Sequence, residues 1–146
     1  MKKRGICMGT VIRSEISKSN PYYISRHRYY ELKHFCLQYP EFKRKYNDLC
    51  EKIPGGIISE TNPDGLSDQE RGYAIREGYL NNMELIEECS KLTDPVLGAY
   101  IFKGVTEGYP YTYFKTKDNI PCCKDTYYEL YRKFFFILSR KKQSSL

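Results

Sequence analysis

Residues able to start, turn or end a helix divide the last third of the chain into three segments, and this division constrains the fold more than any other feature. Asp94 can cap a helix, Pro95 fits its first turn, and Gly108 can adopt the left-handed conformation that ends it. Asn119 can make a second left-handed turn, and Pro121 precedes a long aromatic segment. The pattern predicts a helix, a turn, a short helix, a turn and a long helix, which is the outline of a helix-turn-helix unit.

Each of these segments has apolar side chains at helical spacing, so each is predicted to bury one face. Small residues in the first segment leave room for a close neighbour. Phe136 falls on the polar side of the last segment, which a simple amphipathic helix does not explain. The residues expected to face inward are Val96, Tyr100, Ile101 and Val105 in the first segment, Phe114 and Ile120 in the second, and Cys123, Tyr127, Leu130, Tyr131, Phe134, Ile137 and Leu138 in the third.

The same region carries a resemblance to known proteins. Residues 100–108 (YIFKGVTEG), 120–128 (IPCCKDTYY) and 132–135 (RKFF) resemble small uncharacterised proteins of Gram-positive phages and prophages. More distantly, the region looks like the C-terminal half of phage late-gene regulators of the ArpU and RinA type and like sigma-factor region four. The resemblance implies a phage-encoded regulator that binds DNA through a helix-turn-helix-like unit.

Upstream of this region the patterns predict a mostly α chain, a helical bundle with an extended N-terminal arm. Residues 1–21 show no sustained periodicity and form the predicted arm, followed by a single helical domain over 22–146. Within that domain we expect a helical hairpin or one kinked helix over 22–53 and a linker rich in glycine and proline over 54–66. Residues 67–146 then hold a long helix, which opens with a capping box, and the helix-turn-helix-like unit.

Charge is distributed unevenly along the chain. Residues 1–50 carry a net +7, residues 51–108 a net −6 and residues 109–146 a net +5. Basic ends suit contact with a polyanion, and equally suit contact with the acidic middle. No apolar run is long enough to cross a bilayer and no signal segment follows the basic start, so we expect a cytoplasmic protein of the bacterial host cell without membrane contact.

No catalytic or metal-binding pattern is found. Cys122 and Cys123 are adjacent rather than two residues apart, and no second close pair completes a tetrahedral thiolate site. The chain lacks a phosphate-cradling glycine loop, and its glutamates are better interpreted as a solvated helix face than as an acid and base pair. We therefore predict a protein that is not an enzyme and needs no metal or cofactor, with reduced cysteines that pack as small apolar residues.

The sharper functional prediction is binding of double-stranded DNA. Basic residues cluster around the second and third segments with tyrosines between them, and such residues usually contact phosphates. The competing interpretation is that these charges and tyrosines are ordinary helix surface and core. The predicted nucleic-acid-binding residues are Lys115, Lys117, Lys124, Tyr128, Arg132 and Lys133.

The alternative is a protein-interaction module. The last segment has aromatic residues on nearly all sides, so it would either bury them in a large core or expose an aromatic patch. Phe135 and Phe136 are the residues expected to carry such a patch. The partner would be a second copy of the chain or a host protein, for example a host-defence nuclease.

Overall fold

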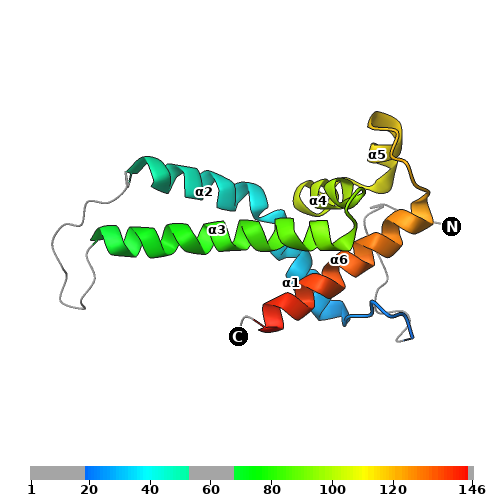
Figure 1. The fold of residues 1–146 in the computed structure, drawn as a ribbon, viewed down its shortest axis with the longest axis horizontal. Coiled ribbons are helices and arrows are strands. Elements are labelled where there is room, and N and C mark those ends of the chain that lie inside the picture. The colour runs from blue at the N-terminus through cyan, green and yellow to red at the C-terminus, as the bar shows by residue number, and fades with distance from the viewer. Residues whose placement is uncertain (1–18, 53–67, 145–146) are drawn as a thin grey trace. The chain divides into compact units, whose positions relative to one another are not determined.

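The computed structural model describes residues 19–52 and 68–144, and in these ranges the chain forms six helices and no strand (Figure 1). The prediction of a mostly α fold is therefore confirmed, as is the order of three helices in the last third of the chain. The helices are α1 (Arg26–Leu37), α2 (Tyr39–Lys52), α3 (Asp68–Thr93), α4 (Gly98–Glu107), α5 (Tyr111–Lys117) and α6 (Lys124–Ser144).

The chain divides into two compact units. Unit 1 comprises residues 1–37 and 86–146, and unit 2 comprises residues 38–85. The division falls between α1 and α2 and again within α3, so the residues expected to form a helical hairpin or one kinked helix over 22–53 contribute to both units. Most of the predicted N-terminal arm, the predicted linker and the capping residue Ser67 lie outside the described residues.

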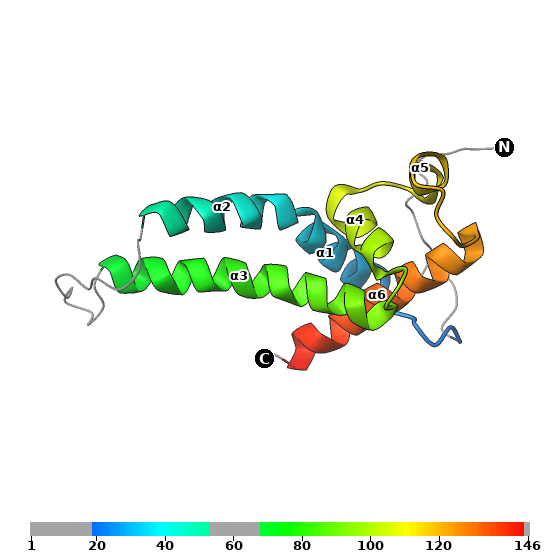
Figure 2. The same cartoon turned by 45° about the horizontal axis from the view of Figure 1, so that its top comes forward.

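The core of unit 1 is built on α1, which packs against both α4 and α6, while α5 packs against α6 (Figure 2). Its side chains are mostly aromatic, and many of the rings meet edge to face, an arrangement that their quadrupoles favour. The buried apolar residues of unit 1 are Ile24, Tyr29, Leu32, Cys36, Ile86, Cys89, Ile101, Val105, Tyr111, Phe114, Ile120, Tyr127, Tyr131, Phe134, Phe135 and Leu138.

A polar link joins α1 to α6 beside this core. The Arg28 guanidinium donates through Nε to the Ser139 hydroxyl at 3.0 Å and through a terminal nitrogen to the Ser139 carbonyl at 3.1 Å. It also pairs with Glu31 at 2.8 Å. The Arg28 side chain therefore links α1 to α6.

The start of α4 shows why the sequence signals were informative. The Asp94 carboxylate accepts hydrogen bonds from the backbone N–H groups of Val96 and Leu97, at 2.8 and 2.6 Å, as a helix cap does. These two bonds lower the pKa of Asp94. Val96, which was expected to be buried, is 71% exposed, because it lies in the capped turn before the helix proper begins at Gly98.

Two glycines allow α4 to approach its neighbours closely, as expected from the small residues of this segment. A Cβ placed on Gly98 would collide with the backbone carbonyl oxygen of Ser90, and one placed on Gly104 would collide with the buried Tyr127 hydroxyl. The helix ends at Gly108, whose φ of 81° is left-handed and whose N–H donates to the Gly104 carbonyl at 2.9 Å.

Unit 2 contains α2 and the first part of α3 and has a much smaller core. In its described residues the buried side chains are Phe42 and Met83, and the Phe42 ring lies 6.1 Å from that of Tyr79. Ile75 is apolar but 53% exposed. Nothing lies within 4 Å of the place that a Cβ added to Gly78 would occupy.

No helix in the described ranges combines the length and apolar character required to span a bilayer.

Candidate nucleic-acid interface

The candidate interface is the corner where α5 ends and α6 begins. The carbonyl of Phe114 accepts the N–H of Asp118 at 3.0 Å and that of Ile120 at 3.2 Å. Asn119 has a φ of 49°, so the predicted left-handed turn at this residue is confirmed. Phe114 and Ile120 are 0% and 3% exposed, as predicted, so the corner is attached to the core at both ends of the turn.

The N-terminus of α6 is capped by Cys123 rather than by a more usual residue. The Cys123 sulfur lies 3.3 Å from the Thr126 hydroxyl, and hydrogen bonds from the Thr126 side chain and backbone lower the pKa of the thiol. Cys123 was expected on the inner face of the helix but is exposed, because it precedes the first helical residue, Lys124.

Three of the predicted DNA-binding residues flank this corner and are exposed. Lys115 and Lys117 lie in the last turn of α5, and Lys124 is the first residue of α6. The connector between the helices is short and hydrogen-bonded, so the backbone positions of the three lysines are fixed relative to the turn. An ammonium group in this setting is hydrated and accessible to an external anion.

The other three predicted DNA-binding residues already interact within unit 1. Arg132 pairs with Glu129 at 3.3 Å. The pKa of Asp94 is lowered mainly by its two backbone hydrogen bonds, and the positive charge of Lys133 makes a smaller contribution in the same direction.

The third of these residues, Tyr128, forms a hydrogen bond with the first residue of α5. Its hydroxyl accepts the backbone N–H of Tyr111 at 3.3 Å, and burial raises the pKa of its phenol. The Tyr111 hydroxyl in turn donates to the Cys122 carbonyl at 2.7 Å. These two bonds connect the beginning of α5 with α6 and with the segment before α6, so Tyr128 is a positioning residue for the corner.

The two residues predicted to form an aromatic patch, Phe135 and Phe136, differ in their exposure to solvent. Phe135 is 1% exposed and contacts Tyr29, Tyr131 and Phe134 at ring-centroid distances of 5.2, 5.1 and 5.0 Å, so its placement on an outer surface was wrong. The reason is that α6 packs against three other helices and buries more than one face.

Phe136, which the sequence pattern placed on the polar side of the last helix, is half-buried. Its ring lies 5.8 Å from that of Tyr22, in the segment before α1. The guanidinium of Arg140 lies 5.6 Å from the centroid of the same ring. Unit 1 therefore covers part of this ring itself.

Basic residues of the C-terminal tail also have partners within the unit. Lys141 pairs with Glu88 at 3.2 Å, and the Lys142 ammonium lies 4.0 Å from the ring centroid of Phe35. The tail therefore contributes to holding α6 against α1 and the end of α3, unlike the lysines at the corner.

One group of side chains was missed by the sequence analysis. Tyr109 and Tyr113 stack in parallel, with ring centroids 3.9 Å apart and an interplanar angle of 7°. The Lys103 ammonium lies 5.8 and 5.7 Å from the two centroids. The spacing of four between the tyrosines is the available signal, but a proline between them and the left-handed glycine before them obscured it.

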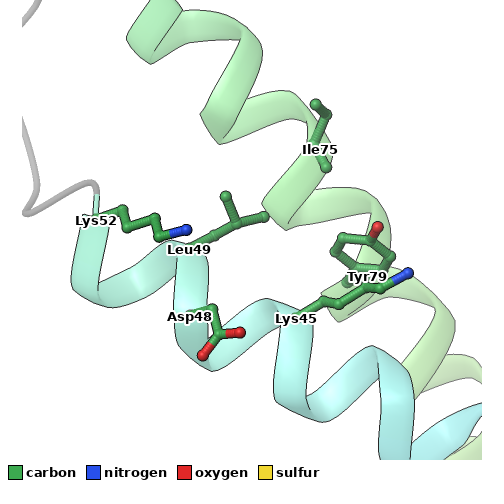
Figure 3. Close-up of a pocket in the computed structure, with 6 residues that line it drawn as sticks. All are labelled: Lys45, Asp48, Leu49, Lys52, Ile75 and Tyr79. Carbon is green, nitrogen blue, oxygen red and sulfur yellow. The ribbon is translucent and has the colours of Figure 1, made fainter.

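Unit 2 has a shallow hollow of about 260 Å³ between α2 and α3 (Figure 3). It contains none of the predicted site residues, and the Lys45 ammonium at its edge already pairs with Glu41 at 2.8 Å and lies 5.8 Å from the Tyr79 ring centroid. The residues that line it are Lys45, Asp48, Leu49, Lys52, Ile75 and Tyr79.

The cysteines of the described ranges are free thiols, and no group of three or more histidine, cysteine or acidic side chains in these ranges could hold a metal ion. Burial raises the pKa of Cys36 well above its ordinary value and that of Cys89 to about 12. These two thiols are neutral at physiological pH and pack as small apolar side chains.

Comparison of the chain with protein-family models, with curated proteins and with solved structures finds no match.

Proposed function

We propose that this chain is a phage-encoded DNA-binding regulator that contacts double-stranded DNA with the corner between α5 and α6, without catalysis or a cofactor. The observation that carries the proposal is the exposure of Lys115, Lys117 and Lys124 around a turn fixed by hydrogen bonds. Lysines held in a defined arrangement fit regularly spaced phosphates better than lysines on a flexible segment, because less conformational entropy is lost on binding.

The observed contacts divide the predicted DNA-binding residues into two roles. The three corner lysines are the proposed phosphate contacts, which supply affinity and orientation but carry no sequence information. Tyr128 positions the start of α5 against α6, and Arg132 pairs with Glu129 along α6, so neither is proposed as a primary phosphate contact. Lys133 is half-buried and is proposed to add only to the positive field beside the corner.

Base reading in this proposal falls to the first turn of α6. In a helix-turn-helix module the N-terminal residues of the last helix reach the base edges in the major groove. The exposed side chains in this part of α6 are Lys124, Asp125 and Thr126.

The alternative, a protein-interaction module using the aromatic face of α6, has less support. Phe134 and Phe135 are 0% and 1% exposed, so the rings that suggested an unfilled surface are mostly covered by the chain's own core. Phe136 remains half-buried beside Tyr22 and Arg140 and is the residue on which this alternative depends. If it is correct, Phe136→Ser abolishes binding to a protein partner, and that binding depends on salt far less than DNA binding does.

The experiment is a fluorescence anisotropy titration of a pool of labelled mixed-sequence duplexes at low ionic strength. The variant Lys115→Glu/Lys117→Glu/Lys124→Glu should bind at least about tenfold more weakly than the wild type, because each reversal replaces a phosphate contact by repulsion. The control Lys43→Glu/Arg44→Glu/Lys52→Glu makes the same change of net charge on exposed positions of α2. It should weaken binding less than about threefold, through the general field alone. Equal losses in the two variants, or no binding by the wild type, would contradict the proposal.

A further inference from the structure

The stacked tyrosines Tyr109 and Tyr113 form an aromatic surface that the DNA-binding corner does not explain. Both side chains are half-buried, whereas Tyr111, Tyr127 and Tyr131 of the same unit are at most 7% exposed. The rings of Tyr109 and Tyr113 are therefore partly accessible to a ligand, unlike the buried rings of these three tyrosines.

The backbone conformation on either side of Tyr109 brings the two tyrosine rings together. The left-handed turn at Gly108 and the extended conformation of Pro110, with a ψ of 168°, lie on either side of Tyr109. The N–H of Tyr113 then donates to the Pro110 carbonyl at 3.0 Å in the first turn of α5. Both rings meet the buried Phe114 ring edge to face, at 6.2 and 5.4 Å, so the pair rests on the core.

The charged groups beside the two rings indicate which class of ligand they could bind. The Lys103 ammonium already lies beside both of them, so an external cation would be repelled from the place that an aromatic pair usually offers it. The neighbouring Tyr113 hydroxyl and the carboxylate of Glu107 raise the pKa of Tyr109, so charges of both signs lie near the pair. Because the Lys103 ammonium lies beside both rings, the surface favours a flat aromatic group with an attached anionic group over a cationic ligand.

A nucleotide has this chemistry, and two further cations lie on the same short helix as Tyr113. Lys117 is one helical turn beyond Tyr113 on α5, and Lys115 is also exposed in that turn. A base inside a duplex is covered on both faces by its neighbours, so a stacking surface selects an unpaired base.

We infer that Tyr109 and Tyr113, with Lys103, form a stacking platform for an unpaired base, so that unit 1 binds DNA with a single-stranded segment more tightly than fully paired DNA. This inference rests on the proposed function and specifies its nucleic acid as duplex with an adjoining single strand. The corner lysines contact the phosphates, and the tyrosine pair holds the base.

The test compares a mixed-sequence duplex with the same duplex extended by a single-stranded thymidine overhang, titrated with the full chain at one ionic strength. The overhang should tighten binding by the wild type about tenfold, a gain typical of stacking one base on an aromatic side chain. Tyr109→Leu/Tyr113→Leu should remove this gain and change binding to the plain duplex less than about twofold. Tyr109→Phe/Tyr113→Phe keeps both rings and should retain the gain. The control Tyr30→Leu alters an exposed tyrosine of α1, near Lys33, and should have no effect on either DNA.

The outcomes separate this inference from the proposed function. Duplex binding that depends on the corner lysines, but shows no gain from the overhang, overturns the platform alone. A gain that survives in Tyr109→Leu/Tyr113→Leu also overturns it, provided that the circular dichroism spectrum shows the wild-type helix content. If neither DNA binds the wild type, both proposals fail.

Discussion

Unit 1 and unit 2 are built from helices of the same chain but differ in how tightly their residues are packed. Gly98 and Gly104 in unit 1 have no space for a methyl group, whereas Gly78 in unit 2 faces open space. Unit 1 buries aromatic residues from α1, α4, α5 and α6 or their connectors, while Phe42 and Met83 are the buried side chains in the described part of unit 2. Tight packing is therefore found in the unit that carries the exposed lysine corner, and the proposed contact with phosphates would use such a fixed geometry.

Truncation of a buried ring should show the largest difference between the units. Phe114 is 0% exposed and contacts the rings of Tyr100, Tyr109, Tyr113 and Tyr127, so Phe114→Ala should lower the free energy of unfolding by about 3–5 kcal/mol. Phe42→Ala in unit 2 should lower it by less than about half as much, because its surroundings can relax into solvent. Urea denaturation followed by circular dichroism measures both. Equal losses would show that the two cores are packed alike.

Glycine substitutions should give a smaller effect whose sign differs between the units. Gly98→Ala and Gly104→Ala should each destabilise the protein by about 1–3 kcal/mol, because the added Cβ meets a backbone carbonyl or a buried hydroxyl. Gly78→Ala should stabilise it by up to about 1 kcal/mol, since alanine favours the helix and meets nothing there. The same chemical denaturation compares the three variants. Destabilisation by Gly78→Ala would contradict the open packing of unit 2.

Local signals predicted the helix ends of unit 1 well. Gly108 and Asn119 each act through their own backbone neighbourhood, as a helix end and a turn, and the structure confirms both. Asp94 makes the predicted kind of side-chain bonds to backbone N–H groups, but it caps the turn before α4, whose N-cap residue is Leu97. Such residues specify their conformation with little help from the rest of the fold, which explains why the helix order could be read from the sequence.

Side-chain environments were harder to predict, because periodicity identifies one apolar face and does not show how many neighbours a helix has. Phe135 is buried because α6 packs against α1, α4 and α5, and this number of neighbours is a tertiary property. Ile75 keeps an apolar position in the pattern but is exposed in unit 2.

The candidate site was predicted in part. The three corner lysines are exposed as expected, but sequence alone could not show that Tyr128 accepts a hydrogen bond from the backbone of Tyr111, seventeen residues earlier in the chain. The pair of Arg132 with Glu129 has a helical spacing of three and is the kind of contact that a sequence pattern can suggest. The pairing of Tyr109 with Tyr113 depends on a turn and a proline, so helical periodicity did not predict it.

The salt dependence of DNA binding tests the central claim most directly, because phosphate contacts release counterions when they form. For the wild type, the logarithm of the association constant should fall linearly with the logarithm of the salt concentration. In Lys115→Ala/Lys117→Ala/Lys124→Ala the slope should be shallower by about 2 to 3, close to 0.9 for each lost phosphate contact. An unchanged slope in this variant, or wild-type binding that is insensitive to salt, would contradict the assignment of the corner as the DNA-binding surface.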